Sequence, residues 1–512
     1  MPYREYPPLG PSLMGYDPVL ELPADHLARL VDQIVDETVV VSGRLPKPGN
    51  VPYDPRLCLK VLVYGYALGI RSSRQLEEMC RDRLSFKLLT RGQTPNYHTL
   101  CNARVGQRDL LEQVWVGLLS VAEASGIKRC GRIVVDSTKL RANASPEAVL
   151  KRDEFEPVLR ELEHILGEAA AVDAAEAEGF SAQTRTGKSI DTEQMRDILR
   201  RVRKQMSASK RAVEGGDAPA PAVGKTKRMT LRMRQQVQKA KSAIESAQEE
   251  GRKNVCITDP DARMMSGTRE NKIQECHSFE AVTDNGILVC AQSSQANNDN
   301  GRLESLVDAA RKGEPEGITA VTADSGYYSG DMIARLAESG IDMCVPDSNT
   351  AADIRRGLTI GTTAGEFKRT VLFTFDAEQN CYRCPEGNVL RHTHERQVQG
   401  QLVSIYRAAR LCTGCPLASE CLAGANTKRR NYSVAHNKLL LDSLRQRFCE
   451  QGHRERYHQR AAAIETVFAF LKRTLGFTHW LLRGADRVAA EASLFKIAYQ
   501  LRKVHVRCAA GR

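Results

Sequence analysis

Two short apolar runs, each ending in an aspartate, decide the fold of this chain: RIVVD at residues 132–136 and ITAVTAD at residues 318–324. Both are rich in β-branched residues and have the length of buried central strands in a sheet. Asp136 and Asp324 are therefore expected at the ends of two strands. An aspartate at a strand end can also form a turn or cap a helix, so each residue has a structural alternative.

The segments around these runs follow a definite order. Further strand-like segments lie at residues 255–257, 276–282, 287–293 and 342–345. Helical spacing of apolar residues covers residues 302–311 and 331–338. Leaving out a long inserted stretch after the first run, the order is a group of strands, then helix, strand, helix, strand. This is the order of an RNase H-like α/β domain, in which the first and fourth strands lie side by side.

Patterning and composition divide the chain into six segments. The expected fold is α/β, with an RNase H-like core, an all-helical N-terminal domain, a helical insertion after the first strand, and a small Cys-rich metal-binding insertion. The expected segments are a helical DNA-binding domain at 1–125, the first part of the core at 126–145, a helical arm at 146–254, the continued core at 255–350, the Cys-rich insertion at 351–435 and C-terminal core helices at 436–512.

Two of these segments carry long helical patterns. In the N-terminal domain the patterns cover residues 26–39, 55–69, 72–89 and 98–124, with Ser72 or Ser73 as an N-cap. In the arm, helical flanks lie on either side of the Pro/Ala/Gly-rich stretch GGDAPAPAVG at 215–224. These flanks are expected to pair as antiparallel helices.

The excess of basic residues bears on which kind of molecule the protein binds. A net charge of +12 and a pI near 9.0 favour a polyanion such as nucleic acid, although an ordinary basic soluble protein has a similar balance. The first residues, MPYREYPPLG, lack the basic start and apolar stretch of a signal peptide. No apolar run approaches the roughly 18 residues of a membrane span. We therefore expect a cytoplasmic protein with no membrane partner and with reduced cysteines.

A cysteine cluster precedes the C-terminal helices. It consists of Cys381-x2-Cys384, Cys412-x2-Cys415 and Cys421. Paired C-x2-C knuckles are typical of a tetrahedral thiolate zinc site. An iron-sulfur cluster and a small core of reduced cysteines are the alternatives. The surrounding basic residues suit either contact with DNA or a solvated surface, and they are Arg407, Arg410, Lys428, Arg429 and Arg430.

Several motifs together resemble the DDE transposases of bacterial insertion sequences. The motifs are Asp136-Ser137-Thr138-Lys139 with Ala142-Asn143-Ala144-Ser145, Ala323-Asp324-Ser325-Gly326-Tyr327-Tyr328, the helix with Tyr457, Arg460, Glu465 and Lys472, Tyr53-Asp54-Pro55-Arg56, Ser72-Ser73-Arg74, Thr258-Asp259-Pro260-Asp261, Asn298-Asp299 and Leu482-Arg483-Gly484. They look most like the cysteine-carrying branch with a tyrosine, arginine, glutamate and lysine box. The resemblance covers nearly the whole chain except the arm.

The resemblance implies a set of site residues and cofactors. Catalysis is assigned to three carboxylates that bind two Mg²⁺ ions, for which Mn²⁺ can substitute: Asp136, Asp324 and Glu465. DNA contacts are assigned to Lys472, Arg460, Tyr457, Arg483 and Lys139. A structural zinc ion is assigned to Cys384, Cys412, Cys415 and Cys421, with Cys381 as a spare or substitute. The implied partners are double-stranded DNA, as terminal inverted repeats and target DNA, and a second copy of the chain in a homodimer on DNA.

Helical geometry bears on the third acid. Glu465 and Lys472 are seven residues apart, so they are expected to share a face of one helix. Beside them runs an apolar stripe of Ile464, Val467, Phe468, Leu471 and Leu475. Arg460 and Glu465 are separated by one residue more than in the commonest form of the box, which places them roughly 140° apart. The other acids that compete for the third position are Asp299, Glu304 and Glu491.

These features predict an enzyme that transfers DNA strands without a covalent enzyme intermediate. Two hard divalent ions suffice for phosphoryl transfer, and a few acids from separate chain segments can hold them. Water would free a 3′-hydroxyl at the element end, and that hydroxyl would attack the opposite strand or the target. An RNase H-like nuclease without strand transfer and a non-enzymatic DNA-binding derivative are the alternatives.

Overall fold

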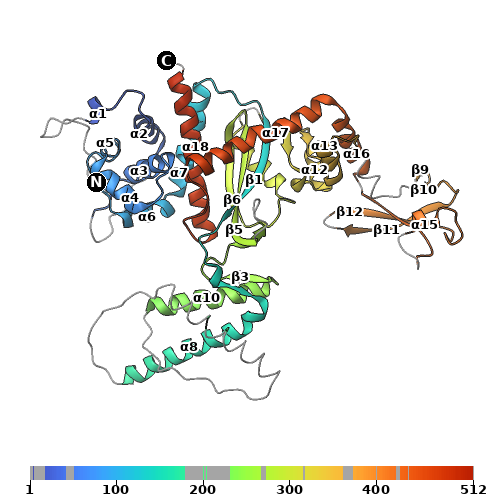
Figure 1. The fold of residues 1–512 in the computed structure, drawn as a ribbon, viewed down its shortest axis with the longest axis horizontal. Helices are drawn as coiled ribbons and strands as arrows, with labels where there is room; N and C mark the ends of the chain where they lie inside the picture. Colours follow the sequence, from blue (N-terminus) through green and yellow to red (C-terminus); the bar gives the residue numbers. More distant parts are fainter. Residues whose placement is uncertain are drawn as a thin grey trace.

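The computed structural model describes residues 4, 18–41, 51–178, 200, 203, 231–266, 273–314, 317–360, 373–376, 378–398, 401–422, 427–435 and 437–510. Figure 1 shows a central sheet flanked by helices, a helical arm and a second sheet at the end of the molecule opposite the N-terminal helices. The Pro/Ala/Gly-rich break expected at 215–224 lies outside the described residues. None of the described helices combines the length and the apolar character needed to cross a membrane.

The central sheet brings the two aspartate-ending runs together. Its strands, in order, are β4 (Arg263–Ser266), β5 (Ile273–Asp284), β1 (Arg132–Arg141), β7 (Ala320–Ala323) and β8 (Asp342–Cys344), with β6 (Ile287–Ser294) also paired to β5. β1 pairs antiparallel with β5 and parallel with β7. The prediction that the first and fourth core strands lie side by side is therefore confirmed.

Two strands differ from the expectation. Residues 255–257 overlap β3 (Asn254–Cys256), which pairs with β2 (Val149–Lys151) in a separate sheet at the base of the arm rather than in the core. β1 does not end at Asp136 but continues to Arg141. Its second half is polar, and it stays extended because the long strand β5 provides backbone partners as far as Cys276.

The N-terminal unit is all-helical, as expected. Its helices are α1 (Pro18–Glu21), α2 (Leu27–Thr38), α3 (Pro55–Ala67), α4 (Ser73–Asp82), α5 (Leu84–Thr90), α6 (Tyr97–Gly106) and α7 (Arg108–Ala124). The helices expected at 72–89 and 98–124 are each divided, because Arg83 and Gln107 leave the helical backbone conformation. Ser72 caps α4 by accepting a hydrogen bond from the backbone N–H of Gln75.

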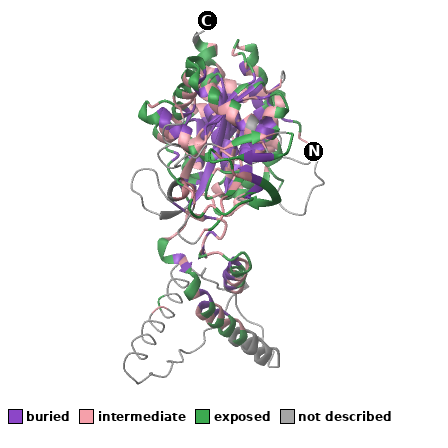
Figure 2. Ribbon diagram, turned by 90° about the vertical axis from the view of Figure 1, so that its right-hand side faces the viewer, coloured by how far each residue is buried: buried purple, intermediate pink, exposed green. Residues whose placement is uncertain are grey.

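Helices cover both faces of the central sheet. They are α11 (Leu303–Arg311), α12 (Gly330–Glu338), α16 (Lys438–Gln446), α17 (Gln451–Ala469) with a π turn at Phe470–Thr474, and α18 (Ala485–Ala510). α17 and α18 share one core with the N-terminal helices and one face of the sheet, and this core contains the whole apolar stripe predicted on α17. α11 and α12 cover the opposite face. Figure 2 shows this central part as the buried interior of the molecule.

The arm and the second sheet each have an apolar cluster of their own. The arm consists of α8 (Arg152–Glu178) and α10 (Leu231–Glu249), which lie side by side as predicted and pack through Leu162 and Ile244. The strands of the second sheet are β13 (Asn431–Ala435), β12 (Gln401–Ala408), β11 (Val389–Val398), β10 (Cys381–Arg383) and β9 (Thr374–Asp376). Short helices are η1 (Pro146–Ala148), η2 (Ser325–Tyr327), η3 (Arg447–Cys449), α13 (Ser348–Arg356) and α15 (Ala418–Cys421).

Candidate active site

Asp136 and Asp324 lie at the same edge of the central sheet. Val135 of β1 and Ala323 of β7 form the last pair of their parallel register, and each aspartate is the next residue along its strand. The side chain of Asp136 is 22% exposed and that of Asp324 is 45% exposed. The two carboxylates are thus close neighbours on a partly open surface, as the strand order requires.

Backbone hydrogen bonds fix one oxygen of each carboxylate. Oδ1 of Asp136 accepts from the N–H of Ser137 at 2.8 Å. Oδ1 of Asp324 accepts from the N–H of Gly326 and so caps the short helix η2. Asp324 therefore caps a helix, which is one of the structural roles that an aspartate at a strand end can have. In both residues Oδ2 is left for other partners.

Arg460 of α17 lies against both Oδ2 atoms. Its Nη1 is 2.9 Å from Oδ2 of Asp136, and its Nη2 is 4.0 Å from Oδ2 of Asp324. Burial raises the pKa of Asp136 to about 6, and the charge of Arg460 opposes this rise. Arg460 thus supplies the positive charge next to two carboxylates that otherwise repel each other.

Asp299, in the loop between β6 and α11, is a third carboxylate at this edge. Its Oδ1 accepts a hydrogen bond from Oγ of Ser137 at 2.8 Å, and Ser137 directly follows Asp136. Burial raises the pKa of Asp299, and the charges of Glu280 and Asp324 raise it further. Carboxylates from separate strands and a loop therefore lie close together here, and their negative charges repel one another.

Gly326 separates two of these carboxylates. A Cβ atom at Gly326 would lie 3.2 Å from Oδ1 of Asp324 and 3.6 Å from Oδ2 of Asp299. Tyr327 follows Gly326 and is buried, and its hydroxyl lies near Ser137 and Asp299. Burial is the main cause that raises the pKa of this hydroxyl, and the charges of Asp299 and Asp136 raise it further. Two carboxylates thus flank the position where Gly326 has no side chain.

Glu465 is not part of this cluster as it stands. Its side chain is exposed, and it forms no hydrogen bond or ion pair within the described part of the chain. Of the other candidates, Glu304 pairs with Arg335 on the surface, and Glu491 is buried and accepts the N–H groups of Leu481 and Leu482. Of the four acids considered for the third position, Asp299 is the one that the structure brings to Asp136 and Asp324.

Lys472 reaches the site from the end of α17. Its Nζ donates to Oγ1 of Thr138 at 2.6 Å, and Thr138 points to the same side of β1 as Asp136. The continuous helix expected from Glu465 to Lys472 is wrong in its last part, because the π turn at Phe470–Thr474 intervenes. A π turn has more residues per turn than an α-helix, so the seven-residue spacing no longer places the two residues on one face.

Two further box and motif residues lie around the carboxylates. The guanidinium of Arg460 is 5.6 Å from the ring centroid of Tyr457, which packs against Phe448 in turn. Tyr457 therefore supports the side chain that bonds Asp136. Lys139 is close enough to Asp299 to lower the pKa of that carboxyl against the effect of burial.

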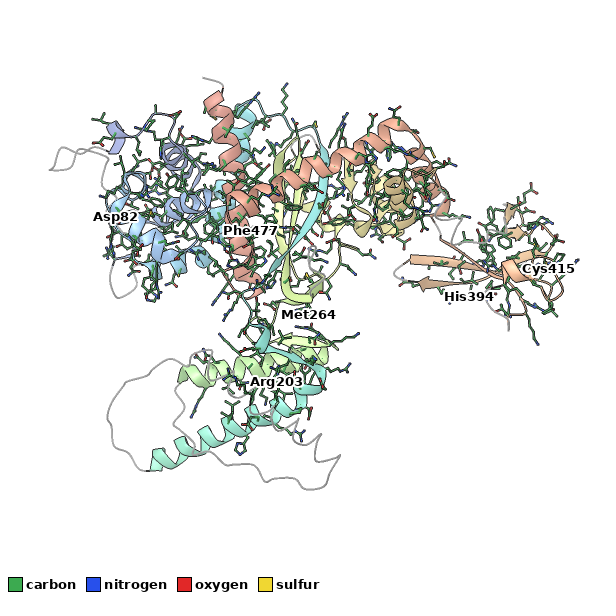
Figure 3. All side chains as sticks on the ribbon, in the orientation of Figure 1. Asp82, Arg203, Met264, His394, Cys415 and Phe477 are labelled. Atoms are coloured by element: carbon green, nitrogen blue, oxygen red, sulfur yellow. The ribbon has the colours of Figure 1, made fainter. Side chains whose placement is uncertain are left out.

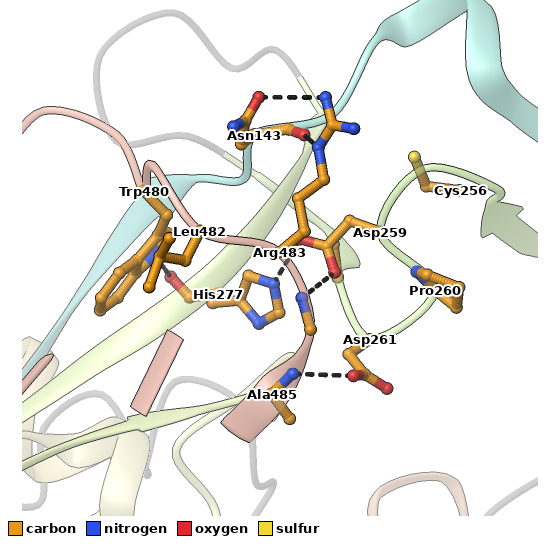
Figure 4. A network of polar contacts seen from close by, with 12 residues as sticks. Asn143, Cys256, Asp259, Pro260, Asp261, His277, Trp480, Leu482, Arg483 and Ala485 are labelled. Atoms are coloured by element: carbon orange, nitrogen blue, oxygen red, sulfur yellow. Dashed lines mark hydrogen bonds and ion pairs between the residues drawn. The ribbon is translucent and has the colours of Figure 1, made fainter. Parts of the chain in front are cut away.

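Arg483 belongs to a network that joins three segments (Figure 4). Its Nε donates to the backbone oxygen of Asn143 at 2.6 Å, and Nδ2 of Asn143 donates to the backbone oxygen of Leu481 at 2.6 Å. The exposed Arg483 is thus fixed to the segment that follows β1.

The motif at residues 258–261 forms the rest of this network. Oδ2 of Asp259 is 2.9 Å from Nε2 of His277, and its Oδ1 accepts from the N–H of Gly484 at 3.0 Å. Oδ2 of Asp261 accepts from the N–H of Ala485 at 2.7 Å and so satisfies the first turn of α18. These aspartates therefore join the base of the arm to the loop before α18.

Four of the five clustered cysteines share one cavity. A cavity of about 290 Å³ in the second sheet is lined by Cys384, Cys412, Cys415 and Cys421. Burial raises the pKa of the Cys421 thiol, and the other three thiols add to this. Cys381 is buried on β10 and lines a different hollow. Figure 3 shows Cys415 at the end of the molecule remote from Phe477 in the core.

The donor chemistry at these two places differs. The sheet edge offers carboxylate and hydroxyl oxygens, which suit Mg²⁺ or Mn²⁺, whereas the remote cavity offers thiols, which suit zinc. Within the described residues, no three His, Cys, Asp or Glu side chains are arranged to hold a metal ion. At the sheet edge Arg460 occupies the free oxygen of Asp136, so an ion there would compete with a guanidinium.

Three members of the site lie in motifs of the sequence but have no role that the sequence predicts: Ser137, Thr138 and Tyr327. The first two lie in the polar half of β1, which the apolar pattern did not mark as strand. A polar pair directly after a strand-end aspartate is the signal that could have found them. Tyr327 belongs to the motif around Asp324, but a buried hydroxyl cannot be inferred from spacing.

Two family models match the chain. The model described as Transposase domain (DUF772) matches residues 20–105, in the N-terminal helical unit. The model described as Transposase DDE domain matches residues 383–505, which contain the cavity cysteines, α17 and most of α18. No curated protein matches the chain. In the sequence, one match precedes and the other follows the strands that carry Asp136 and Asp324. The two matches assign the chain to the DDE transposases of insertion sequences, which are DNA-cleaving proteins.

Proposed function

We propose that this transposase binds the terminal inverted repeats of its insertion sequence, cuts the DNA there and joins the free end to a target. The observation that carries the proposal is the placement of Asp136 and Asp324 on adjacent parallel strands, with Arg460 against both. Glu465 is proposed as the third acid, since it lies on the helix that carries Arg460.

The carboxylate edge fits divalent metal ions. Its donors are all oxygens, and Gly326 leaves space between Asp324 and Asp299. Bound here, two Mg²⁺ ions, or Mn²⁺ in their place, would activate the attacking oxygen and stabilise the leaving oxygen. Asp136 and Asp324 would hold the ions. Arg460 and Lys472 would then neutralise phosphates of the terminal strand, because both side chains already lie beside Asp136 and Thr138.

DNA binding is proposed for surfaces outside this edge as well. Tyr457 and Lys139 lie around it, and Arg483 is held beside Asn143 beyond the end of β1. All three would contact the terminal strand. The helical unit at 1–125 and the arm at 146–254 would grip the duplex, together with the basic residues around the cysteine cavity. Two element ends have to be cut and joined together, so a homodimer on DNA is proposed.

The test is a strand-transfer assay with the full chain. Labelled duplexes would carry the DNA that borders the gene on either side, and a supercoiled plasmid would serve as target in Mg²⁺ or Mn²⁺. The expected result is cleavage at the repeat, followed by covalent linkage of the labelled 3′ end to the plasmid. Cleavage without linkage would indicate the nuclease alternative, and binding without cleavage the DNA-binding alternative.

The cysteine cavity is proposed as a structural zinc site. We expect about one zinc per chain in protein purified without added metal, and loss of most of it when Cys412 and Cys415 are both replaced by serine, because two of four thiolates are removed. Elemental analysis measures this. Cys381→Ser is the matched control and should retain the metal, since Cys381 lies outside the cavity. Equal zinc in the double variant and the wild type would contradict the site, and iron instead of zinc would indicate an iron-sulfur cluster.

Metal binding at the carboxylate edge should weaken in acid. The pKa of Asp136 is raised to about 6, so below that pH its carboxyl is increasingly protonated and a proton must leave before an ion binds. The Mn²⁺ concentration for half-saturation is therefore expected to rise about tenfold for each pH unit below 6 and to change little above it. Calorimetric titration of Mn²⁺ between pH 5 and pH 7.5 measures this. A flat profile would contradict it.

A further inference from the structure

We propose that the second sheet binds the phosphate backbone of double-stranded DNA through a row of three side chains: Arg391, Arg407 and Asn431. The inference rests on the proposed function, since it takes duplex DNA as the substrate of the chain. It names the surface that holds the duplex at this end of the molecule (Figure 1). Contacts to phosphates carry no base sequence, so the row binds DNA of any sequence.

The strand register places the three side chains in one row. Arg391 of β11 is directly opposite Arg407 of β12, and Arg407 is directly opposite Asn431 of β13. Residues directly opposite each other lie on the same face of a sheet, and neighbouring strands are about 4.8 Å apart. All three residues are exposed. The row is thus a line of guanidinium and amide N–H donors on an open surface.

The row lies on the face of the sheet opposite the cysteine cavity. Leu390 and Ala408 pair with each other and line that cavity, and they are the chain neighbours of Arg391 and Arg407. Successive side chains of a strand point to opposite faces, so the two arginines point away from the cavity. Arg391 instead lines an open hollow of about 430 Å³ together with Cys381, the residue opposite it on β10. A ligand of the row therefore does not compete with a metal ion held by the cavity thiols.

The two arginines carry positive charges that no acid matches within the described part of the chain. Like charges directly opposite each other on two strands are destabilising. Asp376 of β9 extends the same row through Cys381, but its Oδ2 bonds Arg383 at 3.0 Å, and this bond lowers the pKa of the Asp376 carboxyl. The one carboxylate of the row is therefore already used, and the repulsion between Arg391 and Arg407 is relieved when an anion binds.

A DNA phosphate is the anion that fits this row best. Guanidinium groups bind phosphate oxygens in pairs of parallel hydrogen bonds, and two of them one strand apart can hold one phosphate or two neighbouring ones. The other end of β12 touches the helix that follows Asp324, because the N–H of Leu402 donates to Oδ2 of Asp331 on α12 at 3.3 Å. Arg407 is five residues from Leu402, or roughly 17 Å along the strand. A duplex covers that distance in about five base pairs.

The test measures binding of the full chain to labelled duplexes by fluorescence anisotropy in EDTA, between about 50 mM and 200 mM salt. One duplex carries the DNA that borders the gene, and the other has the same length and a scrambled sequence. Each phosphate contact contributes about one to the slope of log affinity against log salt. The double variant Arg391→Gln with Arg407→Gln is expected to lower this slope by about two and to weaken binding about tenfold or more, equally for both duplexes. Its melting temperature without DNA should not fall, because a like-charge pair is removed.

Two controls separate the row from a general loss of charge or of fold. Arg383→Gln removes an exposed arginine of the same face whose charge Asp376 already matches, so it should leave the slope unchanged. Arg391→Lys with Arg407→Lys keeps both charges and should keep most of the slope.

The outcomes distinguish the inference from the proposed function. If the glutamine double variant binds both duplexes with the wild-type slope, the row is no phosphate site and the proposed function stands. A loss confined to the bordering DNA would also overturn the inference, since it would indicate that the row reads bases. If the wild type binds neither duplex, the proposed function is wrong as well.

Discussion

Replacing Asp136 by asparagine is expected to lower the rate of cleavage at the element ends roughly a thousandfold or more, with the fold intact. Asparagine has the same shape and can still accept from the N–H of Ser137. It lacks the negative charge that a divalent ion and Arg460 both require. Asp324→Asn should have an effect of the same order, because Asp324 lies beside Asp136 in the parallel register.

Single-turnover cleavage of a labelled end duplex measures this loss. The wild type and both variants would be compared at equal DNA occupancy, which separates a lost chemical step from lost binding. Asp308→Asn serves as control, since it removes the same charge from the exposed surface of α11. Wild-type cleavage by either variant would remove that residue from the proposed site.

Residual activity would distinguish two roles of Asp324. If Asp324 only caps η2, Asp324→Asn should cost little, because an asparagine side-chain oxygen caps a helix as well as an aspartate does. If Asp324 holds an ion, the same change should be severe. The asparagine variant therefore separates the structural alternative from the catalytic one without removing the cap.

The core strands could be predicted because their apolar runs are short, β-branched and bounded. The strand that carries Asp324 and its neighbour at residues 342–345 appear in the structure within a few residues of their expected limits. The second half of β1 could not be predicted, because its extended state depends on backbone bonds to β5 and not on its own side chains. The break at Gln107 was also missed, because apolar spacing continues across it.

The site could be predicted as far as the family motifs reach. Asp136 and Asp324 followed from strand order, and the structure brings them to one sheet edge. The position of Arg460 did not follow, because the helical angle between Arg460 and Glu465 says nothing about which strand lies beneath. The approach of Asp299 to Ser137 did not follow from its motif, since a loop aspartate has no periodicity that would place it there.

Glu465 is proposed as the third acid, although Asp299 is the acid that lies beside Asp136 and Asp324 in the structure. Glu465 is exposed on α17, five residues beyond the arginine that bonds Asp136. Among the described residues, the guanidinium of Arg460 is the cation that acts on the Asp136 carboxylate. If Arg460 turns to a DNA phosphate, Oδ2 of Asp136 becomes free beside α17, the helix that also carries Glu465.

Replacing Arg460 by methionine is expected to strengthen Mn²⁺ binding about tenfold while it lowers cleavage roughly a hundredfold. The guanidinium at 2.9 Å from Asp136 competes with an ion for the same oxygen, so its removal leaves the carboxylates without a cation and raises their affinity for metal. Cleavage falls because the group proposed to neutralise a terminal phosphate is lost. In metal-free buffer the variant should melt lower than the wild type, since Asp136 and Asp324 then repel each other unopposed.

Melting curves with and without Mn²⁺ measure two of these effects, the lower stability without metal and the tighter binding of Mn²⁺. The stabilisation by a ligand grows with the ratio of its concentration to its dissociation constant, so the Mn²⁺-induced rise in melting temperature should be larger in Arg460→Met than in the wild type. Arg335→Met is the matched control, because it removes an exposed pair with Glu304 and should leave the rise unchanged. Arg460→Lys keeps the charge without the planar fork and should fall between wild type and methionine. A rise no larger than that of the wild type would show that Arg460 does not compete with the ion, and Arg460 would then be a permanent support of Asp136.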